Sequence, residues 1–178
     1  MKKLAWTVIA LLLAVFGYVA VIAIPLEAVN VERSTLTTSP ADVGLVFEDF
    51  VVSPQDVDLN LSGWWMPAHR ARAILVFIHG GGSKRSSSYF GSLDFYRAMV
   101  DQGIAVVAID LRNHGASGSD GKGLQFGRTE KHDAAAAIAW ARTRNPKLPV
   151  FVMGISMGGA ALIQAVHAGA KLDGLILL

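Results

Sequence analysis

One serine in this chain has the neighbours that covalent chemistry requires. Residues 154–158 read Gly-Ile-Ser-Met-Gly and follow a short apolar run at 150–153. A serine hydroxyl is a weak nucleophile, so an enzyme exposes it on a tight strand-to-helix turn, near a base and backbone N–H donors. Gly154 and Gly158 allow such a turn, because without a Cβ they let strand and helix approach closely. The pattern predicts that Ser156 is a nucleophile, although alone it also fits a glycine-rich connection in another α/β protein.

A glycine run earlier in the chain suits the stabilisation of negative charge. Residues 79–82 read His-Gly-Gly-Gly and directly follow a continuous apolar run at 73–78, which is typical of a strand buried on both faces. When an acyl group is attacked, backbone N–H donors can stabilise the charge that develops on the carbonyl oxygen. We expect the N–H of Met157 to supply one donor and that of Gly81 the other, with Gly82 as the alternative to Gly81.

A third motif follows another buried-type run at 104–109, where residues 110–118 read Asp-Leu-Arg-Asn-His-Gly-Ala-Ser-Gly. The three motifs, in this order and spacing, resemble the α/β-hydrolase superfamily, and most nearly its serine aminopeptidase-like and esterase-like branch. The resemblance extends from about residue 43 to residue 178. It implies a serine nucleophile followed along the chain by a catalytic Asp or Glu and then a catalytic His.

The residues after the elbow do not supply those two partners in the expected places. Asp173 falls at or just before the start of a predicted final strand, whereas this fold places its acid after a strand, and His167 falls within a predicted helix. His79 and His114 precede the serine and are predicted to be structural. The apolar run at 175–178 has no turn or polar tail after it. We therefore expect this chain to be the N-terminal part of a hydrolase, with a domain that is incomplete at its C-terminal end.

Strand-like and helix-like patterns alternate along the chain, which predicts an α/β fold with a mostly parallel sheet and helices on both faces. The first two strands are expected to be antiparallel. Trp64 and Trp65, adjacent in the second strand, should face opposite sides of the sheet and serve packing. We expect strands at 45–52, 57–66, 73–78, 104–109, 150–153 and 175–178, and helices at 88–102, 130–144 and 157–168.

The N-terminal segment is apolar enough to enter a membrane. Residues 4–26 carry no charge and follow Lys2 and Lys3, and a helix of this length spans a hydrocarbon core of about 30 Å. An uncleaved anchor is favoured over a signal peptide cleaved near Val-Ile-Ala at 21–23, which would give a secreted protein. The positive-inside rule predicts a single-pass membrane protein with a cytoplasmic N-terminus and an extracytoplasmic catalytic domain.

We accordingly divide the sequence into an anchor or signal segment at 1–27, a polar linker at 28–42 and an incomplete hydrolase domain at 43–178. The net charge is +2, and the sequence shows no stripe of basic and aromatic residues that would indicate nucleic-acid binding. The chain has no cysteine, so disulfides and thiolate chemistry are excluded. The remaining His and acidic residues show no metal-ligand spacing, and His132 and Asp133 are expected in a solvated first helical turn. No cofactor is implied.

Two functional hypotheses remain. In the first, the complete protein is a membrane-anchored serine hydrolase that cleaves ester, thioester or peptide bonds of a small-molecule or peptide acyl substrate. In the second, the chain is a non-catalytic fragment or anchored scaffold that keeps the elbow and lacks the triad. An Asp after a later strand, and a His after the strand that follows, would favour the first. The sequence does not indicate an oligomeric state.

Overall fold

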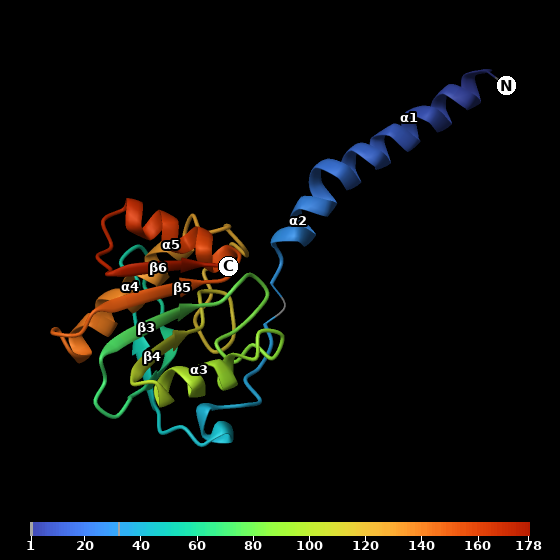
Figure 1. The fold of residues 1–178 in the computed structure, drawn as a ribbon. Coiled ribbons are helices and arrows are strands. Elements are labelled where there is room, and N and C mark those ends of the chain that lie inside the picture. Colours follow the sequence, from blue (N-terminus) through green and yellow to red (C-terminus); the bar gives the residue numbers. More distant parts are fainter. Residues whose placement is uncertain (1, 32) are drawn as a thin grey trace. The chain divides into compact units, whose positions relative to one another are not determined.

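The computed structural model describes residues 2–31 and 33–178, and the chain divides into two compact units, Met1–Asn30 and Val31–Leu178 (Figure 1). The first unit is helical from Lys2 to Val29, with α1 at Lys2–Tyr18, a π-helical turn at Val19–Ala23 and α2 at Ile24–Val29. Pro25 explains the wide turn, because it lacks an N–H and its ring displaces the carbonyl four residues earlier.

The helical run Lys3–Glu27 is long and apolar enough to cross a membrane, with a mean hydropathy of 2.7 over its most apolar window. Its large apolar side chains are exposed within this unit. The expected N-terminal apolar helix is therefore present, and it is a candidate for a membrane span or a signal segment.

The second unit is built on a six-stranded sheet in the order β1-β2-β4-β3-β5-β6 (Figure 1). β2 pairs antiparallel with β1 and with β4, whereas the pairs of β3 with β4, β3 with β5 and β5 with β6 are parallel. The expected mostly parallel sheet with an antiparallel start is confirmed. The strands are Glu48–Val52 (β1), Leu61–Met66 (β2), Ala73–Ile78 (β3), Ile104–Ile109 (β4), Val150–Gly154 (β5) and Gly174–Leu177 (β6).

Helices cover both faces of this sheet, as expected. One core lies between the sheet and the pair α4 (Glu130–Arg144) and α5 (Met157–His167), and the other between the sheet and α3 (Ser92–Asp101). Trp65 belongs to the first core and Trp64 to the second, so adjacent tryptophans face opposite sides and both are buried in packing. Every residue of β3 is buried, which explains its uninterrupted apolar sequence.

Three boundaries differ from the sequence expectation by more than two residues. β1 and β2 begin later than predicted, at Glu48 and Leu61, so the connection between them is longer than expected. Helix α3 begins at Ser92 rather than at residue 88, because Gly91 has a φ of 65° and the preceding residues form a turn in which the Gly91 N–H donates to the Ser88 carbonyl. A short 3₁₀ helix, Pro40–Val43, precedes the sheet, with Pro40 buried in the second unit.

Candidate active site

Ser156 occupies a strained turn between β5 and α5. Its backbone has φ 50° and ψ −115°, a conformation that L-residues seldom adopt outside functional sites. A Cβ on Gly158 would lie 2.4 Å from the Ile78 carbonyl oxygen, and one on Gly154 would lie 2.6 Å from the Gly159 nitrogen. Both glycines are therefore required by close backbone packing, and the turn leaves Ser156 exposed.

The glycine run after β3 lies directly against this turn. A Cβ on Gly80 would be 3.5 Å from the Ser156 Cβ, and one on Gly81 would be 3.6 Å from the Met157 Sδ. The N–H groups of Gly81 and Met157 donate no hydrogen bond to any part of the chain within residues 2–31 and 33–178. Two backbone donors close to the serine are thus open to a ligand.

The third glycine of the run differs from the second. The N–H of Gly82 donates to Nε2 of His114, with a nitrogen–nitrogen distance of 3.0 Å. Nδ1 of the same ring then carries the proton and donates to the Arg112 carbonyl oxygen, 2.7 Å away. Gly82, the alternative oxyanion donor on sequence grounds, already has an acceptor for its N–H inside the protein.

The ring of His79, like that of His114, is held by a hydrogen bond at each nitrogen. Its Nε2 accepts the N–H of Leu111 at 3.0 Å and its Nδ1 donates to the Gly80 carbonyl oxygen at 2.7 Å. Burial, reinforced by the nearby ring of His114, lowers the pKa of His79 to about 4, and burial also lowers the pKa of His114 below its ordinary value. Both nitrogens of both rings are engaged. Neither imidazole can accept the Ser156 proton in this arrangement, which agrees with the structural role expected for them.

The two candidates after the elbow lie away from it, as their sequence positions indicated. Asp173 accepts the N–H of Val150 at 2.8 Å and pairs with Arg142 at 2.9 Å. Val150 begins β5, whereas Ser156 follows the opposite end of that strand. His167 ends α5, which starts at Met157 and has 11 residues, a length of about 16 Å.

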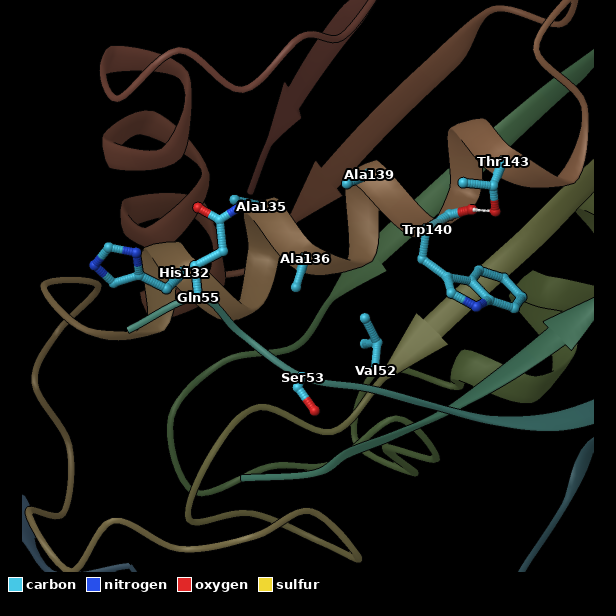
Figure 2. A pocket seen from close by; sticks show the side chains of 9 residues that line it. All are labelled: Val52, Ser53, Gln55, His132, Ala135, Ala136, Ala139, Trp140 and Thr143. Carbon is cyan, nitrogen blue, oxygen red and sulfur yellow. Dashed lines mark hydrogen bonds between the residues drawn. The ribbon is translucent and has the colours of Figure 1, made fainter. Parts of the chain in front are cut away.

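Ser156 opens into a cavity of about 220 Å³ with a largely apolar lining. We call this the acyl cavity; its lining residues are Phe77, His79, Gly80, Gly81, Ser83, Ser87, Tyr89, Phe90, Ile155 and Ser156. A second cavity, of about 290 Å³, lies along α4, where alanine methyl groups run between His132 at one end and Trp140 at the other (Figure 2). The second cavity does not include Ser156 among its lining residues.

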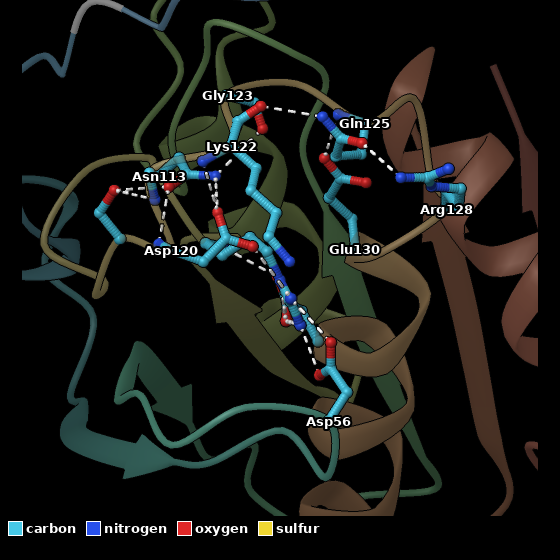
Figure 3. A network of polar contacts seen from close by, with 12 residues as sticks. Asp56, Asn113, Asp120, Lys122, Gly123, Gln125, Arg128 and Glu130 are labelled. Atoms are coloured by element: carbon cyan, nitrogen blue, oxygen red, sulfur yellow. Dashed lines mark hydrogen bonds and ion pairs between the residues drawn. The ribbon is translucent and has the colours of Figure 1, made fainter.

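A buried ion network supports the loop that follows β4. Arg112, 1% exposed, pairs with Asp133 at 2.7 Å, with Asp56 at 2.7 Å and with Asp120 at 3.4 Å. Figure 3 shows Asp56 and Asp120 in this network of polar contacts. Burial disfavours the charge on Arg112, but the hydrogen bonds that Arg112 donates to Asp56 and Asp133 outweigh this effect and raise its pKa. The loop that carries His114 is therefore clamped to α4 and to the β1–β2 connection.

This network corrects one expectation, and it includes ion pairs of Arg112 that the sequence did not reveal. Asp133 is fully buried, so the prediction of a solvated first turn of α4 is wrong at that position, because Arg112 supplies the partner that a buried carboxylate needs. The two partners at 2.7 Å, Asp56 and Asp133, lie 56 and 21 residues away from Arg112 along the chain. No local spacing could have indicated them.

Within the residues that the structure describes, no group of three or more His, Cys, Asp or Glu side chains could hold a metal ion. The chemistry available at this site comes from the serine, the two open backbone N–H groups and the cavity beside them.

The sheet order and the elbow define an α/β hydrolase with the arrangement of a serine hydrolase. The sequence profile described as serine aminopeptidase, S33 matches residues 69–178, and the chain belongs to that family.

Several similar proteins are described as esterases or lipases. The esterase Pf2001 from Pyrococcus furiosus is 28% identical with a TM-score of 0.72, over 82% of this chain and 56% of that one. Lysophosphatidylserine lipase ABHD12 from Macaca fascicularis is 26% identical over 97 residues, which cover 54% of this chain and 23% of the lipase. XC6422 from Xanthomonas campestris, 20% identical over 74% of this chain and 60% of that one with a TM-score of 0.57, shares the fold. The chain thus spans little more than half of the esterase and under a quarter of the lipase.

Proposed function

We propose that the complete protein is a membrane-anchored serine hydrolase of carboxylic esters, with Ser156 as nucleophile and the N–H groups of Gly81 and Met157 as the oxyanion hole. The observation that carries the proposal is the strained, exposed Ser156 packed against a glycine loop with two open N–H donors. Esterase and lipase relatives favour esters over the thioester and peptide bonds that the motifs also allow.

In the proposed reaction, Ser156 Oγ adds to the carbonyl carbon of the ester while its hydroxyl proton passes to a general base. The oxyanion accepts hydrogen bonds from Gly81 and Met157, which is worth several kcal/mol in enzymes of this kind. The bond to the alcohol oxygen then breaks, and the alcohol leaves with that proton. Water, deprotonated by the same base, adds to the acyl carbon, and Oγ leaves as the serine hydroxyl re-forms.

The general base and its orienting acid are proposed to come from residues that follow Leu178 in the complete protein. The engaged nitrogens of His79 and His114 and the remote positions of His167 and Asp173 support this assignment. The partial coverage of the esterase supports it further, since 56% of that chain is matched. The competing hypothesis, a non-catalytic scaffold, makes the opposite prediction for the experiment below.

A fluorophosphonate probe applied to the complete protein tests the nucleophile. We expect covalent labelling that disappears in Ser156→Ala and persists in the control Ser53→Ala, whose serine is exposed on the connection after β1. We expect little labelling of the 178-residue chain alone, because it lacks the proposed base. Labelling that persists in Ser156→Ala would refute the assignment, and a complete protein without labelling would favour the scaffold.

For the membrane arrangement we propose an anchor at 1–27, a linker at 28–42 and a hydrolase domain at 43–178, with the N-terminus cytoplasmic. The apolar run Lys3–Glu27 and the lysines at its N-terminal side support this topology. A reporter fused after Leu178 tests it. We expect an alkaline phosphatase fusion, which needs an extracytoplasmic location, to be active. Activity of a reporter that works only in the cytoplasm would reverse the orientation.

A further inference from the structure

The acyl cavity shares lining residues with a polar cavity that is distinct from the one along α4. We call this polar cavity the headgroup cavity; it has a volume of about 410 Å³. It is lined by Ser34, Gly81, Gly82, Ser83, Lys84, Ser87, Ser88 and Tyr89. The two linings have four residues in common, namely Gly81, Ser83, Ser87 and Tyr89. The two cavities are therefore adjacent, on either side of the segment that contains Gly81 and Ser83.

The two cavities have opposite chemistry. The acyl cavity contains stacked rings of Phe77 and Phe90, with centroids 5.5 Å apart, together with Ile155. The headgroup cavity contains four serine residues and Lys84, and none of the described residues that line it is acidic. An apolar chain suits the first cavity, whereas an anionic group suits the second.

Lys84 is held in place to act as a cation. Its Nζ donates to the Thr35 carbonyl oxygen at 2.6 Å, and since an ammonium group has three N–H donors, this bond leaves others for a ligand.

We propose that the headgroup cavity binds a phosphate carried on the alcohol part of the substrate, so that the enzyme acts on single-chain acyl esters with a phosphorylated alcohol. In this pose the acyl chain occupies the acyl cavity, the ester carbonyl lies at Ser156, and the phosphate meets Lys84 and the serine hydroxyls. Phosphate has several acceptor oxygens, which matches a cavity rich in O–H and N–H donors. This inference rests on the proposed function, because it assigns the alcohol side of that same site.

A binding experiment tests the cavity independently of catalysis. Calorimetric titration of the full chain in detergent with sn-glycerol 3-phosphate should show binding that glycerol does not. Lys84→Gln should weaken this binding about 10-fold or more, the effect of losing one charge-assisted hydrogen bond, and Lys84→Arg should retain most of it. The matched control is Lys147→Gln, whose exposed lysine precedes β5 at the opposite end of the sheet. Equal binding by wild type and Lys84→Gln would overturn the proposal.

A kinetic experiment on the complete protein distinguishes a substrate headgroup from free phosphate. We expect 1-decanoylglycerol 3-phosphate to be hydrolysed with a kcat/KM at least about 10-fold above that of 1-decanoylglycerol. Lys84→Gln should remove this preference, whereas the control Lys147→Gln should keep it. Ser156-dependent hydrolysis with no preference between the esters would overturn the headgroup assignment and leave the proposed function intact. The headgroup assignment would also be wrong if inorganic phosphate bound as tightly as glycerol phosphate and neither ester were preferred. Lys84-dependent binding of glycerol phosphate without hydrolysis of either ester would instead contradict the proposed function.

Discussion

Two loops contact each other at the ends of β3 and β4, and they use most of their polar groups differently. In the loop after β4, residues 110–123, polar groups bind other groups of the protein. Arg112 pairs with three carboxylates, and Asp110 accepts the N–H groups of Arg85 and Ala116. The loop after β3, residues 79–91, leaves Gly81 exposed with an open N–H, and its serines line two cavities. The first loop supports the site, and the second faces the ligand.

The histidines connect the two loops. His79, at the start of the ligand-facing loop, accepts an N–H from the supporting loop, and His114, in the supporting loop, accepts one from Gly82. Neutral imidazole suits this task, since one nitrogen donates while the other accepts. The contrast predicts that substitutions in the supporting loop change mainly stability, whereas substitutions in the ligand-facing loop change mainly binding and rate.

The largest expected effect is on the buried network. Arg112→Met leaves the buried carboxylate of Asp133 without its cationic partner, so we expect a loss of about 3–5 kcal/mol in the free energy of unfolding. Urea unfolding followed by tryptophan fluorescence measures it. Arg142→Met is the matched control, because its pair with Asp173 is solvent-exposed and should contribute far less. Similar losses in the two variants would show that burial does not increase the contribution of the Arg112 network to the free energy of unfolding.

The next effect concerns pH. The pKa of His79 is about 4 in the folded protein and about 6.5 in an unfolded chain, so protons bind preferentially to the unfolded chain. The stability from this group is complete above pH 6.5 and is lost as the pH falls from 6.5 to about 4, by up to roughly 3 kcal/mol.

Unfolding midpoints at about pH 7.5 and about pH 4.5, on either side of the ordinary histidine pKa, test this prediction. We expect His79→Gln to reduce the pH dependence of stability, whatever its effect at neutral pH, because Gln does not titrate. His167→Gln is the control, since that histidine is exposed at the end of α5. If the difference in stability between the two pH values were the same in His79→Gln as in the wild type, it would contradict the assigned pKa and the neutral ring that this pKa implies.

A smaller stability effect, with a clear effect on rate, is expected for the link between the loops. His114→Ala removes the acceptor of the Gly82 N–H, which should cost about 1 kcal/mol. Ester hydrolysis by the complete protein should fall about 10-fold, because the adjacent Gly81 donor is then less well positioned. His114→Gln can restore an acceptor and should recover part of the rate. A loss of stability without a loss of rate would assign His114 a purely structural role.

The smallest effect is expected in the ligand-facing loop itself. Ser83→Ala removes a hydroxyl that lines both cavities, and its stability should change by less than about 0.5 kcal/mol. Hydrolysis of the phosphorylated ester should decrease more than that of the neutral ester. A stability loss comparable to that of Arg112→Met would remove the distinction between the two loops.

Several elements were predictable because their signals are local. The runs at 73–78 and 104–109 are apolar throughout, and both strands have the expected bounds because they are buried in the middle of the sheet. Helix α4 also begins and ends where expected. The start of α3 was not predictable in this way, because the turn that ends at Gly91 depends on a positive φ that the apolar pattern does not report.

The sequence alone determined the order of the elements, the elbow at Ser156 and the glycine run beside it, because steric and periodic preferences act over a few residues. Only the tertiary structure decided which glycine N–H stays open, which carboxylates surround Arg112 and which cavities share a wall. The reason is the sheet order, in which β3 lies between β4 and β5. That order brings the ends of three strands together, so the partner of each polar group at the site is set by contacts between segments remote in sequence.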